Sequence, residues 1–170
     1  MTRFGWVSTT CFSVLSIGVS ALVHPAPKLV WNVSASVPIG LYAVHRADTL
    51  HVGELLAIAP PEPLAIFLDQ RHYLPKGVPL LKRIAALPGQ TACRTGQTIF
   101  VDGVAIGEAL RRDRLGRPLP VWQGCRLIAV GQVFLMNQQS PDSFDSRYFG
   151  PLPSTAIVGG AEPLITFEKD

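Results

Sequence analysis

Charged side chains are scarce in this 170-residue chain. They make up 16% of the residues, whereas soluble domains average near ~25%. Apolar residues make up 48%. This composition and length predict one packed domain with an appendage, and they exclude a disordered or acidic tail protein. The formal net charge of +3 is too small to indicate nucleic-acid binding by itself.

The basic residues are scattered along the chain except for one local group, and this group does not indicate nucleic-acid binding either. Its members are Arg111, Arg112, Arg114 and Arg117. They lie among turn residues and beside Asp113, which favours a solvated loop over a nucleic-acid surface. We therefore predict no nucleic-acid partner.

The common motifs of metal and phosphate sites are also missing. The histidines show no His-x-x-x-His spacing, and the cysteines show no Cys-x-x-Cys spacing. Neither a Gly-x-Ser-x-Gly elbow nor a Gly-x-x-x-x-Gly-Lys phosphate loop occurs. We predict no metal and no cofactor. A Ser/His/Asp triad stays open, although nothing selects one of the four histidines, which are His24, His45, His51 and His72.

The N-terminus carries an uncharged run over residues 4–23. A helix of that length spans roughly 30 Å, about the thickness of a bilayer core. Arg3 precedes the run, which favours a cytoplasmic N-terminus. We predict a cytoplasmic segment at 1–3, a transmembrane anchor at 4–23 and a periplasmic domain at 24–170. A cleavable signal peptide is the alternative, and it would export the same domain.

Three cysteines are present. Cys11 lies in the uncharged run, whereas Cys93 and Cys125 lie in the predicted exported domain, where a disulfide would persist. We predict that these two are bonded, which would stabilise the fold by ~3–4 kcal/mol in the chain-entropy model. Two buried free thiols are the alternative.

Short apolar runs between Pro and Gly turns predict a mainly β domain, barrel-like or built from two sheets. The expected strand segments are 41–46, 54–59, 80–85, 99–106, 126–130, 133–136 and 157–167. Asp102-Gly103 predicts a two-residue hairpin turn inside one of these segments. Gly131-Gln132 is a weaker hairpin signal, and residues 64–74 are the one exported segment with a helical pattern.

Ser36 lies in the first segment that could carry chemistry. Pro38 follows it and pushes the residue before it toward extended geometry, while Gly40 permits a turn or a close backbone approach. Such a segment can hold a serine hydroxyl in one exposed orientation. An ordinary turn entering a strand shows the same pattern.

Lys82 lies in the second segment. Strand alternation places it on the face of Leu80 and Ile84, with Arg83 on the opposite face. Burying a lysine among aliphatic side chains lowers its pKa, so that the neutral amine can act as a general base. Alternatively, Lys82 extends from an edge strand into water.

Ser143, Asp145 and Arg147 alternate in the third segment. In an extended chain they would point the same way, so Asp145 and Arg147 could pair and brace the segment. Ser143 could then hydrogen-bond a neutral amine and orient it. The alternative is a polar loop with a surface ion pair, which would contribute little.

The three segments, in this order after an anchor, resemble the signal peptidase I family. The family has a serine shortly before a proline, then Lys-Arg-x-x-x-Leu-Pro-Gly, matched at residues 82–89, and then Ser-x-Asp-Ser-Arg-x-x-Gly, matched at 143–150. The likeness is greatest to the conjugative-transfer branch, the TraF type. Gln90 stands where ordinary signal peptidases have Asp, and residues 137–142 replace their Gly-Asp-Asn-Arg-Asp-Asn run.

The resemblance implies a role for each site residue. Ser36 would be the nucleophile and Lys82 the general base. The Ser36 N–H and the Ser34 hydroxyl would stabilise the oxyanion, and Ser143 would orient Lys82. Asp145 and Arg147 would hold that strand.

The resemblance also implies a membrane-bound serine endopeptidase that matures a membrane-tethered precursor. In the conjugative branch this precursor is a pilin, and the product is linear or cyclic. The implied location is the bacterial inner membrane, single-pass, with the catalytic domain periplasmic, where the lipid bilayer and conjugative transfer machinery are the expected partners. The alternatives are a general signal peptidase and a non-catalytic, membrane-tethered pilus assembly factor.

Overall fold

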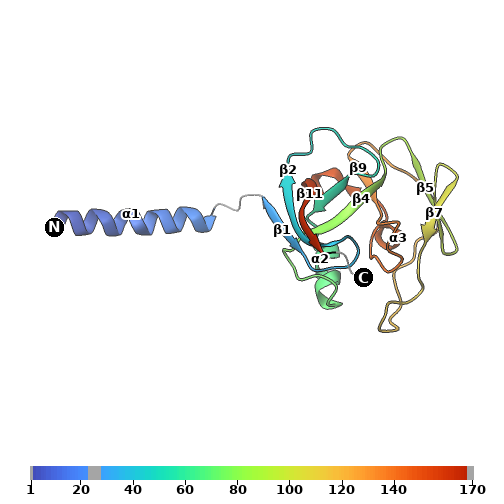
Figure 1. The fold of residues 1–170 in the computed structure, drawn as a ribbon, viewed down its shortest axis with the longest axis horizontal. Coiled ribbons are helices and arrows are strands. Elements are labelled where there is room, and N and C mark those ends of the chain that lie inside the picture. Colours follow the sequence, from blue (N-terminus) through green and yellow to red (C-terminus); the bar gives the residue numbers. More distant parts are fainter. Residues whose placement is uncertain (1, 23–27, 168–170) are drawn as a thin grey trace.

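The computed structural model describes residues 2–22 and 28–167. An N-terminal helix, α1 (Arg3–Leu22), is followed by a β-domain (Figure 1). The predicted anchor at 4–23 coincides with α1 except for Val23, which lies outside the described residues. No helix within the described part of the chain has both the length and the apolar character needed to cross a membrane.

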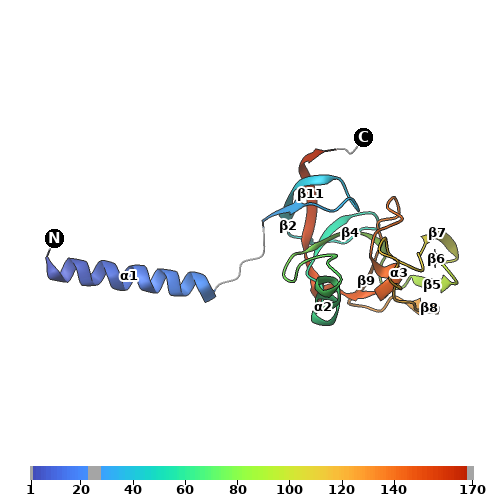
Figure 2. The ribbon, with the colours of Figure 1, turned by 90° about the horizontal axis from the view of Figure 1, so that it is seen from below.

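The β-domain contains two antiparallel sheets, so the mainly β expectation is confirmed. The larger sheet runs in the order β1 (Leu29–Asn32), β2 (Ile39–His45), β11 (Ile157–Phe167), β3 (Leu55–Ile58), β4 (Leu80–Ala86), β9 (Gln132–Leu135) and β10 (Leu152–Pro153). The smaller sheet runs β7 (Val104–Glu108), β6 (Thr98–Val101), β5 (Thr91–Thr95) and β8 (Gly124–Leu127). Figures 1 and 2 both show the smaller sheet at the end of the domain remote from β1.

The two predicted hairpins have opposite outcomes. Asp102 and Gly103 join β6 to β7 with positive φ at both residues, as a two-residue hairpin turn requires. The hairpin predicted at Gly131-Gln132 is wrong. A turn does form there, but β8 pairs with β5 in the smaller sheet while β9 pairs with β4 in the larger one.

Cys93 and Cys125 occupy paired positions on β5 and β8, and their sulfurs form a disulfide. The bond joins the edge strand β8 to the rest of the smaller sheet. Cys11 on α1 is exposed and free.

Helix α2 (Glu62–Gln70) is shorter than the helix expected at 64–74. It ends because His72 adopts a positive φ of 56° and Tyr73 turns its N–H back to the Leu68 carbonyl. This turn brings the Tyr73 ring against Phe144, with ring centroids 5.3 Å apart. The end of α2 therefore packs beside the third candidate segment.

Strand β4 lies at the centre of the core. It pairs with β3 on one side and with β9 on the other, and all its residues except Arg83 are buried. Its aliphatic side chains contribute to three separate apolar clusters, for example through Leu81, Ile84 and Ala86. Lys82 therefore lies on an interior strand of the larger sheet, not on an edge strand.

Candidate active site

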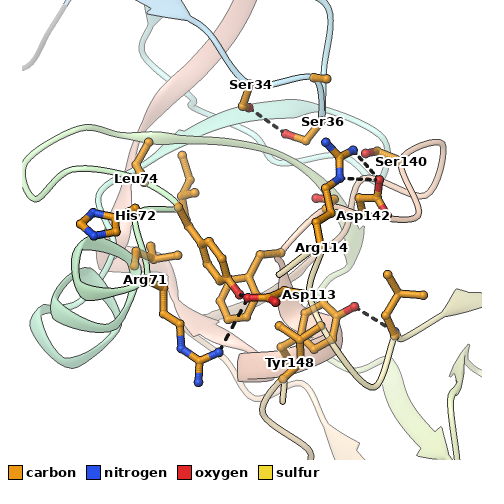
Figure 3. A pocket seen from close by; sticks show the side chains of 18 of the residues that line it. Ser34, Ser36, Arg71, His72, Leu74, Asp113, Arg114, Ser140, Asp142 and Tyr148 are labelled. Atoms are coloured by element: carbon orange, nitrogen blue, oxygen red, sulfur yellow. Dashed lines mark hydrogen bonds and ion pairs between the residues drawn. The ribbon is translucent and has the colours of Figure 1, made fainter. Parts of the chain in front are cut away.

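Ser34 and Ser36 lie in the loop between β1 and β2, where Asn32 organises the backbone. The Asn32 Oδ1 accepts from the Ser34 N–H at 3.1 Å and from the Ser34 hydroxyl at 3.0 Å. Its amide nitrogen donates to the carbonyls of Ser34, Val37 and Pro38. The two serine hydroxyl oxygens are then 3.2 Å apart, and Figure 3 shows them facing each other.

Strand β2 anchors the other end of this loop. The Tyr42 hydroxyl donates to the Pro38 carbonyl at 2.6 Å. Gly40 has a φ of 153°, and a Cβ there would lie 2.0 Å from the Ile165 carbonyl oxygen. Only glycine therefore allows β11 to approach β2 this closely, which explains the Ser-x-Pro-x-Gly spacing in structural terms.

Lys82 is buried with 3% of its surface exposed. Its amine nitrogen lies 3.3 Å from the Ser36 hydroxyl and 2.7 Å from the Ser143 hydroxyl. The pKa of Lys82 is lowered to about 8, mainly by burial; nearby Asp145 opposes this change and Arg147 adds to it. A substantial fraction of Lys82 is therefore neutral near physiological pH. The neutral amine contacts a serine hydroxyl that could give it a proton.

The third segment is not extended, so the prediction that Ser143, Asp145 and Arg147 share a strand face is wrong. Asp145 instead caps the short helix α3 (Ser146–Phe149) and accepts from the Arg147 N–H. The local reason is chemical, because an aspartate before an orphan helical N–H favours a cap.

The Asp145–Arg147 ion pair is internal, not on the surface. Both side chains are at most 1% exposed, and the guanidinium binds the carboxylate through Nε and Nη2, each at 2.8 Å. Arg147 also donates to the backbone carbonyls of Ser140 at 2.8 Å and Glu108 at 3.1 Å. The pair thereby holds the turn that carries Ser143.

Asn137 is a site residue that sequence reasoning did not single out. Its Oδ1 accepts from the Arg83 N–H at 3.0 Å, and its amide nitrogen donates to the Leu81 carbonyl at 3.1 Å. These two contacts flank Lys82 on both sides. The Asn137 N–H also donates to Asp145 at 3.1 Å. The signal available in the sequence was its place directly after the apolar run 133–136, at the start of the third candidate segment.

The candidate dyad opens onto a pocket of about 380 Å³, a volume typical of ligand sites. Figure 3 shows Ser34 and Ser36 on one side and Arg71 with Asp113 on the other. Most of the lining is apolar, and it includes Leu68, Leu74, Leu80, Leu110, Leu119, Phe144 and Tyr148. Arg114 pairs with Asp142 at 2.5 Å on the lining. An apolar pocket beside a serine hydroxyl can receive side chains of a peptide.

Asp113 is an acidic residue of the pocket lining, and its carboxylate accepts hydrogen bonds from Tyr73 and Arg117. These donors hold the pKa of Asp113 well below its usual range, against the effect of desolvation. Among the described residues, no group of three or more His, Cys, Asp or Glu side chains could hold a metal ion.

Comparison with known proteins identifies the chain as a serine peptidase. The chain belongs to the family described as "Signal peptidase, peptidase S26", whose family model matches residues 1–165. The peptidase activity implies a protein substrate.

Three relatives illustrate the range of similarity. "Probable conjugal transfer protein TraF" of Sinorhizobium fredii is 35% identical over 146 residues, covering 80% of this chain and 76% of the relative. "Conjugal transfer protein TraF" of Agrobacterium fabrum is 34% identical over 148 residues, covering 81% and 82%. "Probable signal peptidase I-1" of Synechocystis sp. is 33% identical over 110 residues, covering 65% and 52%.

Proposed function

We propose that the enzyme cleaves its substrate with a Ser/Lys dyad made of Ser36 and Lys82. The observation that carries this proposal is the buried Lys82 amine in contact with the Ser36 hydroxyl. In its neutral form Lys82 takes the Ser36 proton as the hydroxyl attacks the scissile carbonyl. The same group then returns the proton to the leaving amine, and an acyl-enzyme remains on Ser36.

Three further groups support this chemistry. The Ser36 N–H and the Ser34 hydroxyl are the proposed oxyanion donors, since Ser34 lies 3.2 Å from the nucleophile oxygen. Ser143 orients the amine through its 2.7 Å contact with Lys82. Asp145 and Arg147 hold the turn on which Ser143 lies.

We infer that the substrate is a conjugative pilin or a related exported precursor. The support is the similarity over about four fifths of the chain to proteins called conjugal transfer protein TraF. The acyl-enzyme is resolved by water, giving a linear product, or by an amine of the substrate, giving a cyclic one. A general signal peptidase is the second candidate, favoured by the similarity to a signal peptidase I.

We further propose that α1 holds the enzyme at the bacterial inner membrane, with the β-domain on the periplasmic side. The family is membrane-associated, and α1 exposes apolar side chains such as Phe12 and Ile17. Trp31 on β1 and Phe167 at the end of β11 are also more than half exposed. Their ring centroids are 6.3 Å apart. The Cys93–Cys125 disulfide fits an oxidising compartment.

Cell fractionation tests this location. The full chain should sediment with membranes and resist high-salt washing, whereas a variant lacking residues 2–22 should be released. Protease added to spheroplasts should digest the β-domain. A β-domain that stays protected until the cells are lysed would contradict the periplasmic assignment.

Substitution of the dyad tests the chemistry. Ser36→Ala and Lys82→Ala should each remove cleavage by a factor on the order of 10³ or more while the fold persists, because either change removes a reacting group. Ser8→Ala, on α1 and remote from the pocket, is the control. Full activity in either dyad variant would disprove the mechanism. Retained pilus assembly with Ser36→Ala would instead favour a non-catalytic assembly factor.

Substrate preference is tested with the purified enzyme and two precursors. One is a conjugative pilin precursor and the other is an exported preprotein with an ordinary signal peptide. Mass spectrometry locates the cut and distinguishes a cyclic product, which is lighter than the linear one by one water molecule. Cleavage of both precursors at similar rates would identify a general signal peptidase.

A further inference from the structure

Helix α3 is held from the smaller sheet as well as from the larger one. Arg94 on β5 donates from Nη1 to the Arg147 carbonyl at 2.7 Å. Trp122, which precedes β8, donates from its indole nitrogen to the Ser146 carbonyl at 3.1 Å. Figures 1 and 2 both show α3 between the two sheets.

These donors matter because α3 has a single turn of four residues. A helix this short is not stable in isolation, since forming the first turn fixes several residues for one hydrogen bond. Its position therefore depends on contacts made by its neighbours. Two of its carbonyls are bound by side chains that the smaller sheet and its flanking segment supply.

Arg94 is unusual in its own surroundings. Its side chain is buried with 2% of its surface exposed. It donates to the carbonyls of Gly96, Pro120 and Arg147, and no ion pair in the described part of the chain includes it. A buried charge without a carboxylate partner is costly. An apolar side chain would avoid this cost but would leave the Arg147 carbonyl without its donor, so the arginine indicates a role in holding α3.

A continuous set of contacts leads from Arg94 to the candidate base. The Arg147 backbone carbonyl accepts a hydrogen bond from Arg94. The Arg147 side chain donates to the Asp145 carboxylate and to the Ser140 carbonyl. These contacts fix the turn in which the Ser143 N–H bonds the Ser140 carbonyl at 3.1 Å. Ser143 in turn lies 2.7 Å from the Lys82 amine.

We propose that Arg94 is a positioning residue of the active site, which holds α3 so that Ser143 stays in contact with Lys82. This proposal rests on the Ser/Lys function proposed above. It assigns a catalytic consequence to the smaller sheet, none of whose strands contributes a residue to the pocket lining described above. Without Arg94, α3 and the Ser143 turn shift, and water reaches the Lys82 amine.

The charges around Lys82 set the direction of the expected effect. Asp145 and Arg147 lie on the α3 side, and the pocket adds Arg71, Asp113, Arg114, Arg117 and Asp142. All of these remain in an Arg94 variant. Burial is the largest cause of the lowered pKa of Lys82, so admitting water raises that pKa and moves activity to higher pH.

The experiment compares Arg94→Ala, Trp122→Phe and a control, Arg112→Gln, in the full chain. Arg112 is exposed and donates to the Gly116 carbonyl within its own loop. Arg94→Ala should lower kcat by roughly 10–100-fold with KM within about threefold, because the reacting groups are displaced while most of the pocket lining lies outside α3 and the Ser143 turn. The rising limb of the pH–rate profile should move up by about half a pH unit or more.

A second readout does not depend on activity. NMR titration of ¹³C-labelled lysine, with the Lys82 signal assigned through Lys82→Met, should show Lys82 titrating at higher pH in Arg94→Ala than in wild type. Trp122→Phe keeps an aromatic ring, though a smaller one, and loses the donor to Ser146, so a smaller change in the same direction is expected. If Arg94→Ala does not fold, the titration of Lys82 in Trp122→Phe decides whether contacts from this side of α3 position the Ser143–Lys82 pair.

Each result has one meaning. A lower kcat with both pH changes, in a folded variant and not in Arg112→Gln, supports the positioning role. An unmoved profile and titration, or a loss confined to KM, overturns it. If the wild type cleaves no precursor, the proposed function fails, while the titration still tests whether Arg94 positions the Ser143–Lys82 contact.

Discussion

The two halves of the candidate dyad are built differently. Ser36 is half-buried in a loop held mainly by one side chain, that of Asn32. Lys82 is buried on the interior strand β4, and Ser143, Asp145 and Arg147 around it are almost wholly inaccessible. The difference follows from chemistry, because a nucleophile has to reach the substrate whereas a lysine base has to be kept from water.

The two halves also depend on different interactions. Neutral hydrogen bonds from an amide fix the Ser36 loop, whereas a buried ion pair with several carbonyl partners fixes the Ser143 turn. Damage to the nucleophile half should therefore reduce activity more than stability. Damage to the ion pair that holds the Ser143 turn should reduce both.

The strongest test of this contrast is Asp145→Ala. Removing the carboxylate leaves the Arg147 charge buried and unpaired, so the free energy of unfolding should fall by ~3–5 kcal/mol. Urea denaturation measures the change. Asp142→Ala breaks the more exposed pair with Arg114 and should cost less than ~1 kcal/mol. Equal losses in the two variants would show that the buried pair does not hold the base half together.

Lys82→Met tests the burial of the base, and here the free energy of unfolding should rise instead of fall. Below a pH of about 8 the folded protein carries a protonated Lys82 whose pKa lies below the ordinary 10.5. The unfolded chain binds that proton more tightly, so wild-type stability is reduced at low pH and recovers as the pH rises to about 10.5. The variant lacks this penalty.

Lys82→Met should therefore be more stable than wild type by ~2–3 kcal/mol at pH 6–7, with the gain vanishing near pH ~10.5. Denaturation over that pH range measures the difference. Lys76→Met is the control, because Lys76 is an exposed partner of Glu62. A gain independent of pH would mean that burial does not destabilise the charged amine.

Asn32→Ala tests the nucleophile half. Losing the amide frees the Ser34 and Ser36 region, so kcat should fall roughly 10–100-fold through misplacement of the nucleophile. The thermal midpoint should change less than in Asp145→Ala. Val33→Ala, at an exposed neighbouring position, should keep wild-type kcat. A stability loss as large as that of Asp145→Ala would remove the proposed contrast.

The smallest expected effect is that of Tyr42→Phe. This change deletes the hydroxyl that donates to the Pro38 carbonyl and should cost ~1 kcal/mol. A modest reduction in kcat should accompany it, because the far end of the loop is loosened. Tyr73→Phe deletes a hydroxyl outside the Ser36 loop that donates to the Asp113 carboxylate, and it should cost more, about 1.5–3 kcal/mol, because its acceptor is charged.

Much of the larger sheet could be predicted from sequence because most of its strands are short apolar runs bounded by turn residues. The alternation around Lys82 correctly placed Arg83 outside and Lys82 inside. By contrast, the strands β1 and β5 were not expected, although each pairs with the next strand along the chain, because polar residues such as Asn32 and Arg94 interrupt their apolar pattern. The Gly131-Gln132 error has a different origin, because a local turn does not decide which sheet each flanking strand joins.

The sequence by itself determined the chemical groups of this protein: a serine loop, a lysine on an apolar strand, and an Asp-Ser-Arg segment. The tertiary structure decided how they meet. It placed Lys82 3.3 Å from Ser36 and 2.7 Å from Ser143, across 46 and 61 residues of chain. It also turned the expected extended segment into a capped helix with a buried ion pair. Such contacts depend on how distant strands pack, which local patterns do not encode.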